Sequence, residues 1–398
     1  MAKKIAVGID IGTYQIKIVV MESVREDGKT TYKIIGTGFA ESKGLRHGYI
    51  INSLDTMNSL RLALAEAEKT AKVKIKRAFL SIGGIGVSSV ISHGSIIISQ
   101  ADSEITELDV KSVLSVAESE IPANSSINKK IVHAIPVSYK LDGRPVLGQP
   151  VGMKGIKFEV KALFVTCLEH HLTDLIDTVE DLGIEVTNII ASPLAGSLVT
   201  LTKTQKIAGC VLANIGSETV SVVVFENNIP ISLEVFPIGG TDITNDIALG
   251  LKIPLEEAEI LKINTNQETD YPRKKLEEII LARLSDIFDL IESYLKKLGR
   301  SGLLPAGIIL TGGTSGVSTI EDLARATLRL PSKLGSINFF TNQKNCQIKD
   351  SSWSVAYGLC VWGLSNSDEF SFGALSSAHP QSRGLLKRLV VWFKQFLP

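Results

Sequence analysis

Two segments far apart in the chain place a glycine and a hydroxyl residue in the same order between two apolar runs. Residues 5–20 read IAVGIDIGTYQIKIVV, and residues 209–224 read GCVLANIGSETVSVVV. A turn built from glycine and a small hydroxyl residue exposes several backbone N–H groups, which together suit phosphate oxygens. Two facing turns of this kind could hold one polyphosphate from both sides. The aligned pairs are Asp10 with Asn214, Gly12 with Gly216, and Thr13 with Ser217.

Each of the two segments also predicts its own local structure. Two short β-branched runs around a tight turn are typical of a β-hairpin. A single turn of this composition is most often an ordinary hairpin turn. Its repetition about half a chain away favours a functional pair, and it predicts a molecule made of two related halves.

The second half of the chain contains a strand that ends in glycines. Residues 307–311 read as a buried strand, residues 312–314 read Gly-Gly-Thr, and residues 319–330 have a helical pattern. A strand that ends in two glycines before a helix lets the backbone approach a flat ligand closely. Such turns are common, so this signal alone is weak.

Another glycine pair, Gly239-Gly240, precedes a helical stretch at 244–251, and a further helix is predicted at 255–263. Glu259 and Lys262 share one face of that last helix. Taken by themselves, these two residues are best interpreted as a solvated ion pair.

Composition excludes several classes of protein. The 398 residues are 44% hydrophobic and 21% charged, which is ordinary for a folded chain of two or three domains. Lys and Arg number 42 and Asp and Glu number 42, so no overall basic field favours nucleic acid. The four cysteines lie far apart and the histidines form no metal-binding pattern, which argues against a disulfide scaffold and a metal site. We expect neither a signal peptide nor a membrane span, because no apolar run reaches about 18 residues.

Two regions outside the hairpins have clear patterns. Residues 84–162 interrupt the first half with four predicted strands and one helix, 107–121, which begins after the N-cap candidate Thr106 and stops at Pro122. This region predicts a small α+β domain. Residues 273–299 have the apolar spacing of one long amphipathic helix, and Gly299 is its C-cap candidate. The four strands of the region 84–162 are predicted at 87–90, 95–99, 131–139 and 158–164.

The end of the chain reads as a polar linker, 365–382, followed by an amphipathic helix, 383–398. The apolar residues of this helix fall on one arc of about 160°, and only Val391 lies outside it. A basic face opposite an aromatic face is typical of a helix that lies in the membrane interface. A core helix that docks back onto the body, or a calmodulin-type target helix, would look similar. The residues expected to bind the membrane are Leu385, Leu386, Lys387, Arg388, Leu389, Trp392, Phe393, Lys394 and Phe396.

The order of these motifs resembles the actin, Hsp70 and sugar-kinase superfamily, and within it the FtsA family of bacterial cell-division proteins. The segments FPIGGTDITNDIALGL, IPLEEAEILK, GIILTGGTSGVSTIEDLA and SSWSVAYGLCVWG carry the resemblance over nearly the whole chain. The insertion after Phe79-Leu80-Ser81 and the C-terminal amphipathic helix favour this family over its relatives. The resemblance implies an α/β fold of actin-like, duplicated ribonuclease-H-like domains with a nucleotide cleft and a small inserted α+β domain.

The resemblance also implies domain boundaries. The first actin-like domain (1A) would comprise 1–83, 163–194 and about 353–364, with the inserted domain (1C) at 84–162. The second actin-like core (2A) would comprise 195–226 and 301–352. A helical and strand subdomain (2B) would occupy 227–300.

By the same resemblance, the cleft would bind ATP and Mg²⁺. The turn Gly12, Thr13, Tyr14 and Gln15 would contact the phosphates together with Lys17, and Asp10 would hold Mg²⁺ through water. The second hairpin would grip the phosphates from the other side, and the remaining residues would surround the adenosine. The second hairpin contributes Asn214, Gly216, Ser217, Glu218 and Thr219, and the adenosine pocket contains Gly239, Gly240, Glu259, Lys262, Gly312, Gly313 and Thr314.

Two positions depart from the family pattern. The second hairpin usually has an aspartate where this chain has Asn214, and the connecting helix often has an acidic or amide residue near Ser192. An amide cannot act as a base and adds no charge around Mg²⁺. The departures therefore predict ATP binding with weak or absent hydrolysis.

The resemblance implies a protein that polymerises on the cytoplasmic face of the bacterial inner membrane, at the division septum. It would tether filaments of the tubulin-like protein FtsZ by binding their C-terminal peptide, with Arg283 at the contact, and would recruit later division proteins. Its partners would thus be FtsZ, further copies of itself, the anionic membrane surface and downstream division proteins. Two alternatives remain open, a PilM-like type IV pilus assembly protein and a small-molecule kinase of the same fold.

Overall fold

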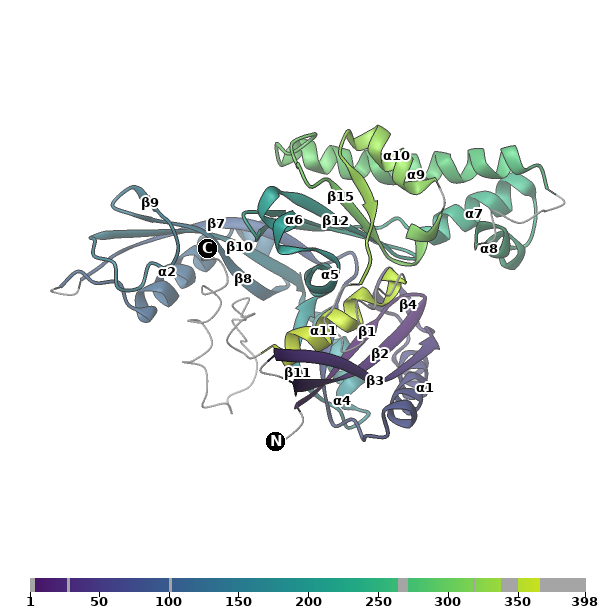
Figure 1. Ribbon diagram of the computed structural model, residues 1–398, viewed down its shortest axis with the longest axis horizontal. Helices are drawn as coiled ribbons and strands as arrows, with labels where there is room; N and C mark the ends of the chain where they lie inside the picture. The colour runs from purple at the N-terminus through teal and green to yellow at the C-terminus, as the bar shows by residue number, and fades with distance from the viewer. Residues whose placement is uncertain are drawn as a thin grey trace.

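The computed structural model describes residues 4–26, 29–99, 102–263, 271–317, 319–337 and 350–365. Its core consists of two five-stranded sheets with the same topology (Figure 1). In each sheet an antiparallel meander of three strands is extended by two parallel strands, and the first strand of the meander lies in the centre. The expected α/β fold with duplicated halves is confirmed.

The strands of the two sheets correspond one to one. The first sheet has the order β3 (Lys29–Glu41), β2 (Gln15–Glu26), β1 (Lys4–Ile11), β6 (Arg77–Ile82) and β11 (Glu185–Ala191). The second has the order β14 (Ile229–Phe236), β13 (Val220–Glu226), β12 (Cys210–Ile215), β15 (Ile308–Thr311) and β16 (Ser332–Leu334).

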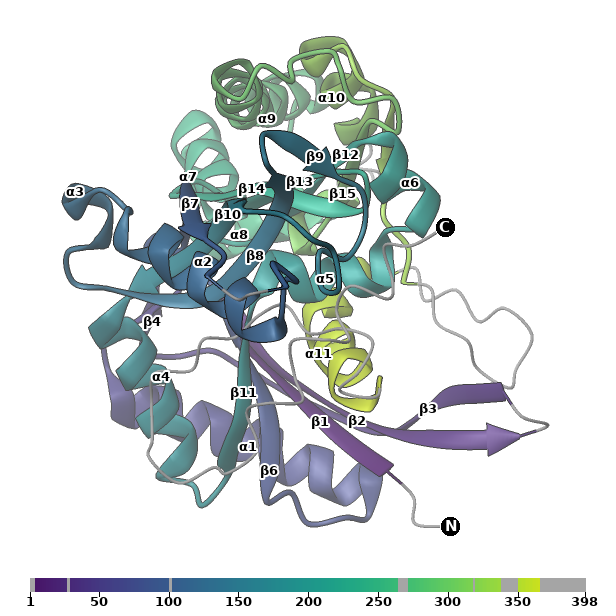
Figure 2. The ribbon, with the colours of Figure 1, turned by 90° about the vertical axis from the view of Figure 1, so that its left-hand side faces the viewer.

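Helices cover both faces of the first sheet. Figure 2 shows α1 (Ser53–Ala71) and α4 (Glu169–Glu180) on one face and α11 (Ser354–Leu364) on the other. The helix α5 (Ser192–Thr200) packs against α11 and also contacts strands of the second sheet. Since α5 and α11 lie between the halves, the chain crosses from one half to the other next to the cleft. The short elements β4 (Leu45–Arg46), β5 (Tyr49–Ile50), α6 (Lys203–Ala208), η1 (Gly313–Gly316) and η2 (Ser351–Trp353) complete the two halves.

Besides α6, the second half contains four longer helices among the described residues: α7 (Gly240–Leu251), α8 (Leu255–Ile263), α9 (Arg273–Lys297) and α10 (Ile320–Leu328). The helix predicted at 255–263 has those bounds. The long helix α9 buries one apolar stripe, as its pattern predicts, and the chain leaves it through Gly299 at φ +68°. In contrast, α7 begins four residues before the predicted 244, because Asp242 accepts a hydrogen bond from the N–H of Gly239 and caps the helix.

The inserted domain is a second small layer of sheet and helix. Its four strands have the order β7 (Ser88–Ile97), β10 (Lys157–Leu168), β8 (Lys129–Leu141) and β9 (Arg144–Val146). Two helices accompany them, α2 (Glu107–Ser119) and α3 (Ala123–Ser126), and Thr106 and Asp109 form a reciprocal capping box at the start of α2. The strand β9 and the helix α3 were not predicted.

The prediction of two separate strands at 87–90 and 95–99 is wrong, because β7 is one continuous strand. The sequence Ile-Ser-His-Gly at 91–94 looks like a break, yet Gly94 pairs with Val160 in the sheet. A Cβ on Gly94 would lie 2.2 Å from the carbonyl oxygen of Val113 in α2. Glycine is therefore required here for close packing between strand and helix, and not for a turn.

The inserted domain also touches the second half of the molecule. The hydroxyl of Ser89 in β7 donates to the carbonyl oxygen of Leu233 in β14 at 2.8 Å and accepts the N–H of the same residue at 2.7 Å. This domain is connected in sequence to the first half, so it spans both halves.

The predicted amphipathic helix 383–398 and all of the predicted linker except Ser365 lie outside the described residues. The domain boundaries stay predictions. Among the helices that the structure describes, none has both the length and the apolar character needed to cross a bilayer.

Candidate functional site

The two aligned segments form hairpins with the same turn. In the first, Ile11 pairs with Ile16, and the N–H of Gly12 donates to the carbonyl oxygen of Gln15 at 3.2 Å. In the second, Ile215 pairs with Val220, and Gly216 donates to Thr219 at 2.8 Å. Each turn therefore contains four residues that begin with glycine, and the predicted repeat is present in three dimensions.

Both turns line one cavity of about 550 Å³. Sixteen of the predicted nucleotide-binding residues contribute to its wall. From the first half they are Asp10, Gly12, Thr13, Tyr14, Gln15 and Lys17, and from the second half they are Asn214, Gly216, Ser217, Thr219, Gly240, Glu259, Lys262, Gly312, Gly313 and Thr314.

Several lining residues carry no signal in the sequence. They come from short connections whose place depends on the tertiary fold, such as Gly83 and Gly84 after β6 and Ser352 before α11. Ser192, noted earlier only as a departure from the family pattern, also lines the cavity. The additional polar residues of the wall are Ser221, Thr241, Thr244, Asn245 and Glu256.

Asp10 and Lys17 face each other across the first hairpin, because they are paired residues of β1 and β2. The hydroxyl of Ser81 in β6 donates to Oδ1 of Asp10 at 2.8 Å. Burial raises the pKa of the Asp10 carboxyl above its ordinary value, while the hydrogen bond from Ser81 and the charge of Lys17 act against that rise. The first half thus brings a carboxyl group and a lysine amino group together at the cavity wall.

The ammonium group of Lys17 has partners from the C-terminal part of the fold. It donates to the carbonyl oxygen of Ser352 at 2.9 Å and lies 5.7 Å from the ring centre of Trp353. Burial lowers the pKa of Lys17, and the charges of Asp10 and Asp350 oppose this shift. An ammonium group that donates to a neutral carbonyl oxygen is well placed to donate to a phosphate oxygen, which is a stronger acceptor because it is charged.

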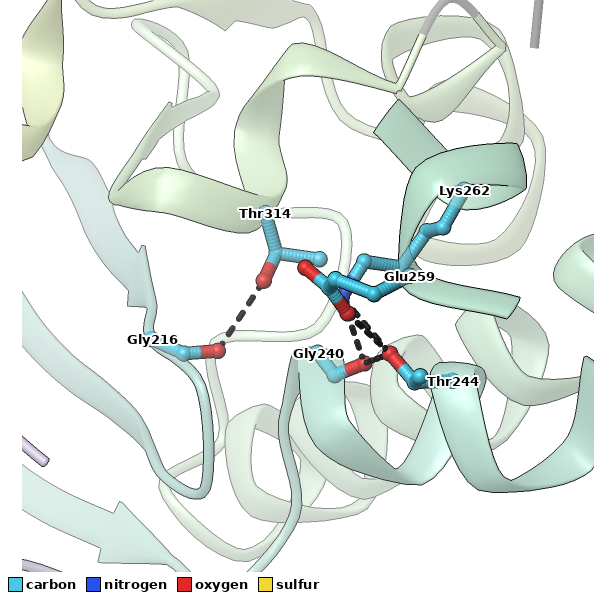
Figure 3. A network of polar contacts seen from close by, with 6 residues as sticks. All are labelled: Gly216, Gly240, Thr244, Glu259, Lys262 and Thr314. Atoms are coloured by element: carbon cyan, nitrogen blue, oxygen red, sulfur yellow. Dashed lines mark hydrogen bonds and ion pairs between the residues drawn. The ribbon is translucent and has the colours of Figure 1, made fainter. Parts of the chain in front are cut away.

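A network of polar contacts in the second half forms another part of the cavity wall (Figure 3). Nζ of Lys262 lies 2.6 Å from Oε2 of Glu259 and 2.8 Å from the hydroxyl of Thr244, and it donates to the carbonyl oxygen of Gly240 at 3.1 Å. Thr244 also donates to Oε2 of Glu259 at 2.5 Å. The Lys262 side chain is only 11% exposed. The pair is therefore anchored to the start of α7, unlike the solvated ion pair that the spacing alone suggested.

Gly312 is the point at which the strand β15 meets the second hairpin. It has a φ of +94°, and a Cβ at this position would lie 2.4 Å from Oδ1 of Asn214. Only glycine can combine this backbone conformation with this contact. From there the chain continues into η1, where the hydroxyl of Thr314 donates to the carbonyl oxygen of Gly216 at 3.0 Å (Figure 3).

Two predicted residues, Glu218 and Gly239, lie outside the cavity wall. The carboxylate of Glu218 accepts a hydrogen bond from the backbone N–H of His47 at 2.5 Å. The backbone carbonyl oxygen of Glu218 lies 3.1 Å from Nδ1 of the His47 ring. Gly48 in the same turn donates to the hydroxyl of Thr13 at 3.1 Å. The turn of His47 and Gly48, between β4 and β5, therefore contacts both hairpin turns.

Arg283 lies on α9, away from the cavity wall. Its guanidinium group binds Asp246 of α7 through two hydrogen bonds, of 2.6 Å and 3.0 Å, and lies 3.3 Å from a carboxylate oxygen of Asp286. The hydrogen bond to Asp246 raises the pKa of Arg283. The predicted partner-binding residue is thus already held in place by an acidic pair on the surface of the second half.

Comparison with known proteins identifies the family. A model of the cell division protein FtsA matches residues 211–358, and a model of the SHS2 domain inserted in FtsA matches residues 84–166. The cell division protein FtsA of Pseudomonas aeruginosa is 30% identical, and the alignment covers 98% of this chain and 97% of that protein. The chain belongs to the FtsA family. FtsA of Bacillus subtilis is 29% identical over 90% of this chain and 83% of its own length.

Solved structures agree with the actin-like fold of this FtsA-family chain. A chain of the PilM–PilN type IV pilus biogenesis complex superposes with a TM-score of 0.67 at 17% identity, covering 91% of this chain and 99% of that one. The ethanolamine utilization protein EutJ of Carboxydothermus hydrogenoformans gives 0.54 at 14% identity, covering 91% and 90%. At such low identity these likenesses concern the fold alone, so the FtsA relationship is better supported than the PilM alternative.

Proposed function

We propose that this chain is an actin-like cell-division protein that binds ATP between its two halves, assembles on the inner membrane and tethers FtsZ filaments to it. The observation that carries the proposal is the single cavity lined by both duplicated hairpin turns. Backbone N–H groups from both turns and the ammonium of Lys17 suit a triphosphate. The anchored Glu259–Lys262 network in the cavity wall offers a carboxylate and an ammonium to a ribose and base.

In this proposal ATP acts as a conformational ligand, because it contacts both halves at once and favours their closed arrangement. A bound Mg²⁺ would neutralise phosphate charge, and Asp10 would hold it through water. The second hairpin offers only the neutral amide of Asn214, and the start of α5 offers only the hydroxyl of Ser192. Neither group can take a proton from an attacking water, so these positions do not promote hydrolysis.

We therefore expect calorimetry to detect binding of ATP in the presence of Mg²⁺ by the purified full-length chain, and to detect little release of phosphate. Asn214→Asp adds a carboxylate beside the phosphates and should raise the hydrolysis rate about tenfold or more. A turnover of several per minute by the unmodified monomer would refute weak hydrolysis. A failure to bind any adenine nucleotide would refute the nucleotide site.

The second part of the proposal concerns FtsZ, whose C-terminal peptide we place at the surface of α7 and α9. Arg283 presents a cation on this surface, fixed in orientation by its bidentate contact with Asp246. A fixed guanidinium suits the carboxylates of an acidic, apolar peptide, since it needs little further ordering.

Arg283→Gln should weaken binding of an FtsZ tail peptide about tenfold or more, as measured by fluorescence anisotropy. Glutamine is preferable to glutamate here, because a new carboxylate beside Asp246 and Asp286 would disturb the surface by repulsion. Asp246→Asn is the matched control, because it removes the charge of the same ion pair yet keeps the arginine and an amide oxygen that can accept from it, so binding should fall much less than in Arg283→Gln. Equal losses in both variants would mean that Arg283 only stabilises the fold.

The remaining parts of the proposal are the location and the assembly. The basic amphipathic pattern of 383–398 supports peripheral attachment to the cytoplasmic face of the inner membrane at the septum. The membership of the FtsA family supports self-assembly into actin-like filaments and recruitment of downstream division proteins.

A further inference from the structure

The duplication places a hydroxyl residue beside each of the two residues that lead into the hairpin turns. In the first half, β1 runs parallel to β6, with Ile9 opposite Leu80, and the next positions are Asp10 and Ser81. In the second half, β12 runs parallel to β15, and Asn214 lies directly opposite Thr311. Ser81 and Thr311 are therefore equivalent positions, and both are buried, with 3% and 1% of their surface exposed.

The two hydroxyl groups nevertheless bond differently. Ser81 donates to Oδ1 of the Asp10 side chain at 2.8 Å. Thr311 donates to the backbone carbonyl oxygen of Ala213 at 3.3 Å and not to Asn214. The symmetry of the backbone is thus broken at the side chains, since only the first half combines a carboxylate with a hydroxyl donor that holds it.

We propose that Ser81 is a positioning residue for the divalent cation that accompanies the nucleotide, an inference that rests on the proposed ATP site. Its hydroxyl engages Oδ1 of Asp10, which orients the carboxylate and leaves Oδ2 for the hydrated cation. Lys17 is the residue paired with Asp10 across the hairpin, so the two side chains share one face of the sheet. The cation is accordingly held from the first half alone.

This assignment has a physical basis in how cation sites are built. Carboxylates that bind a metal or its water shell need a second layer of hydrogen bonds to fix their orientation, and loss of such a partner typically costs 10–100-fold in metal affinity. Ser81 is buried behind the cavity wall and is not one of the residues that line it. It can therefore act on a ligand only through Asp10.

The test compares ATP affinity of the full-length chain with Mg²⁺ and with EDTA, measured by calorimetry. Ser81→Ala should weaken Mg·ATP binding about tenfold and leave binding of metal-free ATP nearly unchanged. Ser81→Thr keeps the hydroxyl and should restore most of the affinity. Thr311→Val removes the equivalent hydroxyl in the second half and should leave the ratio of the two affinities as in the unmodified chain.

A double-mutant cycle strengthens the test. In an Asp10→Asn background, Ser81→Ala should change the ratio no further, because its only route to the cation has been removed. Should Ser81→Ala fail to fold by circular dichroism, Ser81→Cys replaces it, since a thiol of similar size donates weakly and should lower the ratio.

Three outcomes would overturn the assignment: equal losses with and without Mg²⁺, an unchanged ratio in Ser81→Ala or Ser81→Cys, or an equal effect of Thr311→Val. If the unmodified chain binds no ATP in either condition, the proposed nucleotide site itself fails, which is a distinguishable result.

Discussion

Lys17→Met should weaken binding of Mg·ATP by about 100-fold, the largest effect that we expect from a single substitution in the cavity. A hydrogen bond to a charged group contributes about 1.5–3 kcal/mol, and each 1.4 kcal/mol corresponds to a factor of ten in affinity. Methionine keeps the length of the side chain beside Trp353, so the change removes mainly the charge.

The control for this substitution is Lys74→Met, which removes a lysine that is 83% exposed and paired with Glu68 on the surface. Its ATP affinity should equal that of the unmodified chain. Thermal unfolding of both variants separates loss of binding from loss of stability. Retention of full affinity by Lys17→Met would mean that the phosphates do not lie between the two hairpins.

Removal of residues 383–398 should abolish cosedimentation with vesicles that contain anionic phospholipid. Each Lys or Arg near such a surface contributes about 1 kcal/mol, and insertion of several large apolar side chains into the acyl boundary adds more. Without the segment we expect the protein to remain in the supernatant at the lipid concentrations that sediment the full-length chain.

Two point variants refine this result. Trp392→Gln places a polar group on the apolar arc and should weaken vesicle binding strongly. Val391→Gln is the matched control, because position 391 already falls on the polar side of the helix. If the segment instead docks onto the body of the protein, its removal should lower the melting temperature and leave vesicle binding as it was.

Local chemistry explains why much of this molecule is readable from its sequence. Both hairpin turns contain glycine followed by a small hydroxyl residue. Alignment of the two copies is enough to predict a pair of similar hairpins. The helix at 255–263 and the shared face of Glu259 and Lys262 follow from helical spacing alone. Assignment to the cleft required the resemblance to a family, because spacing does not say which elements meet in space.

Contacts between distant parts of the chain were beyond sequence analysis. Ser81 reaches Asp10, and Glu218 reaches His47, only because strands and turns from separate segments converge on the cavity. A carboxylate in a predicted phosphate loop suggests a ligand contact, whereas in the fold Glu218 turns away to another part of the protein. The wrong prediction of a strand break near Gly94 has a similar cause, since the helix that requires a glycine there lies about twenty residues later in the chain.

The turn of His47 and Gly48 has a kinetic consequence. It joins Thr13 of one hairpin turn to Glu218 of the other through backbone N–H groups, so the halves cannot separate at this edge unless those hydrogen bonds break. In the proposed ATP site, opening of the cavity at this edge would break both hydrogen bonds. These two hydrogen bonds would then add to the barrier for release of the proposed nucleotide, beyond the barrier that a hinge alone would impose.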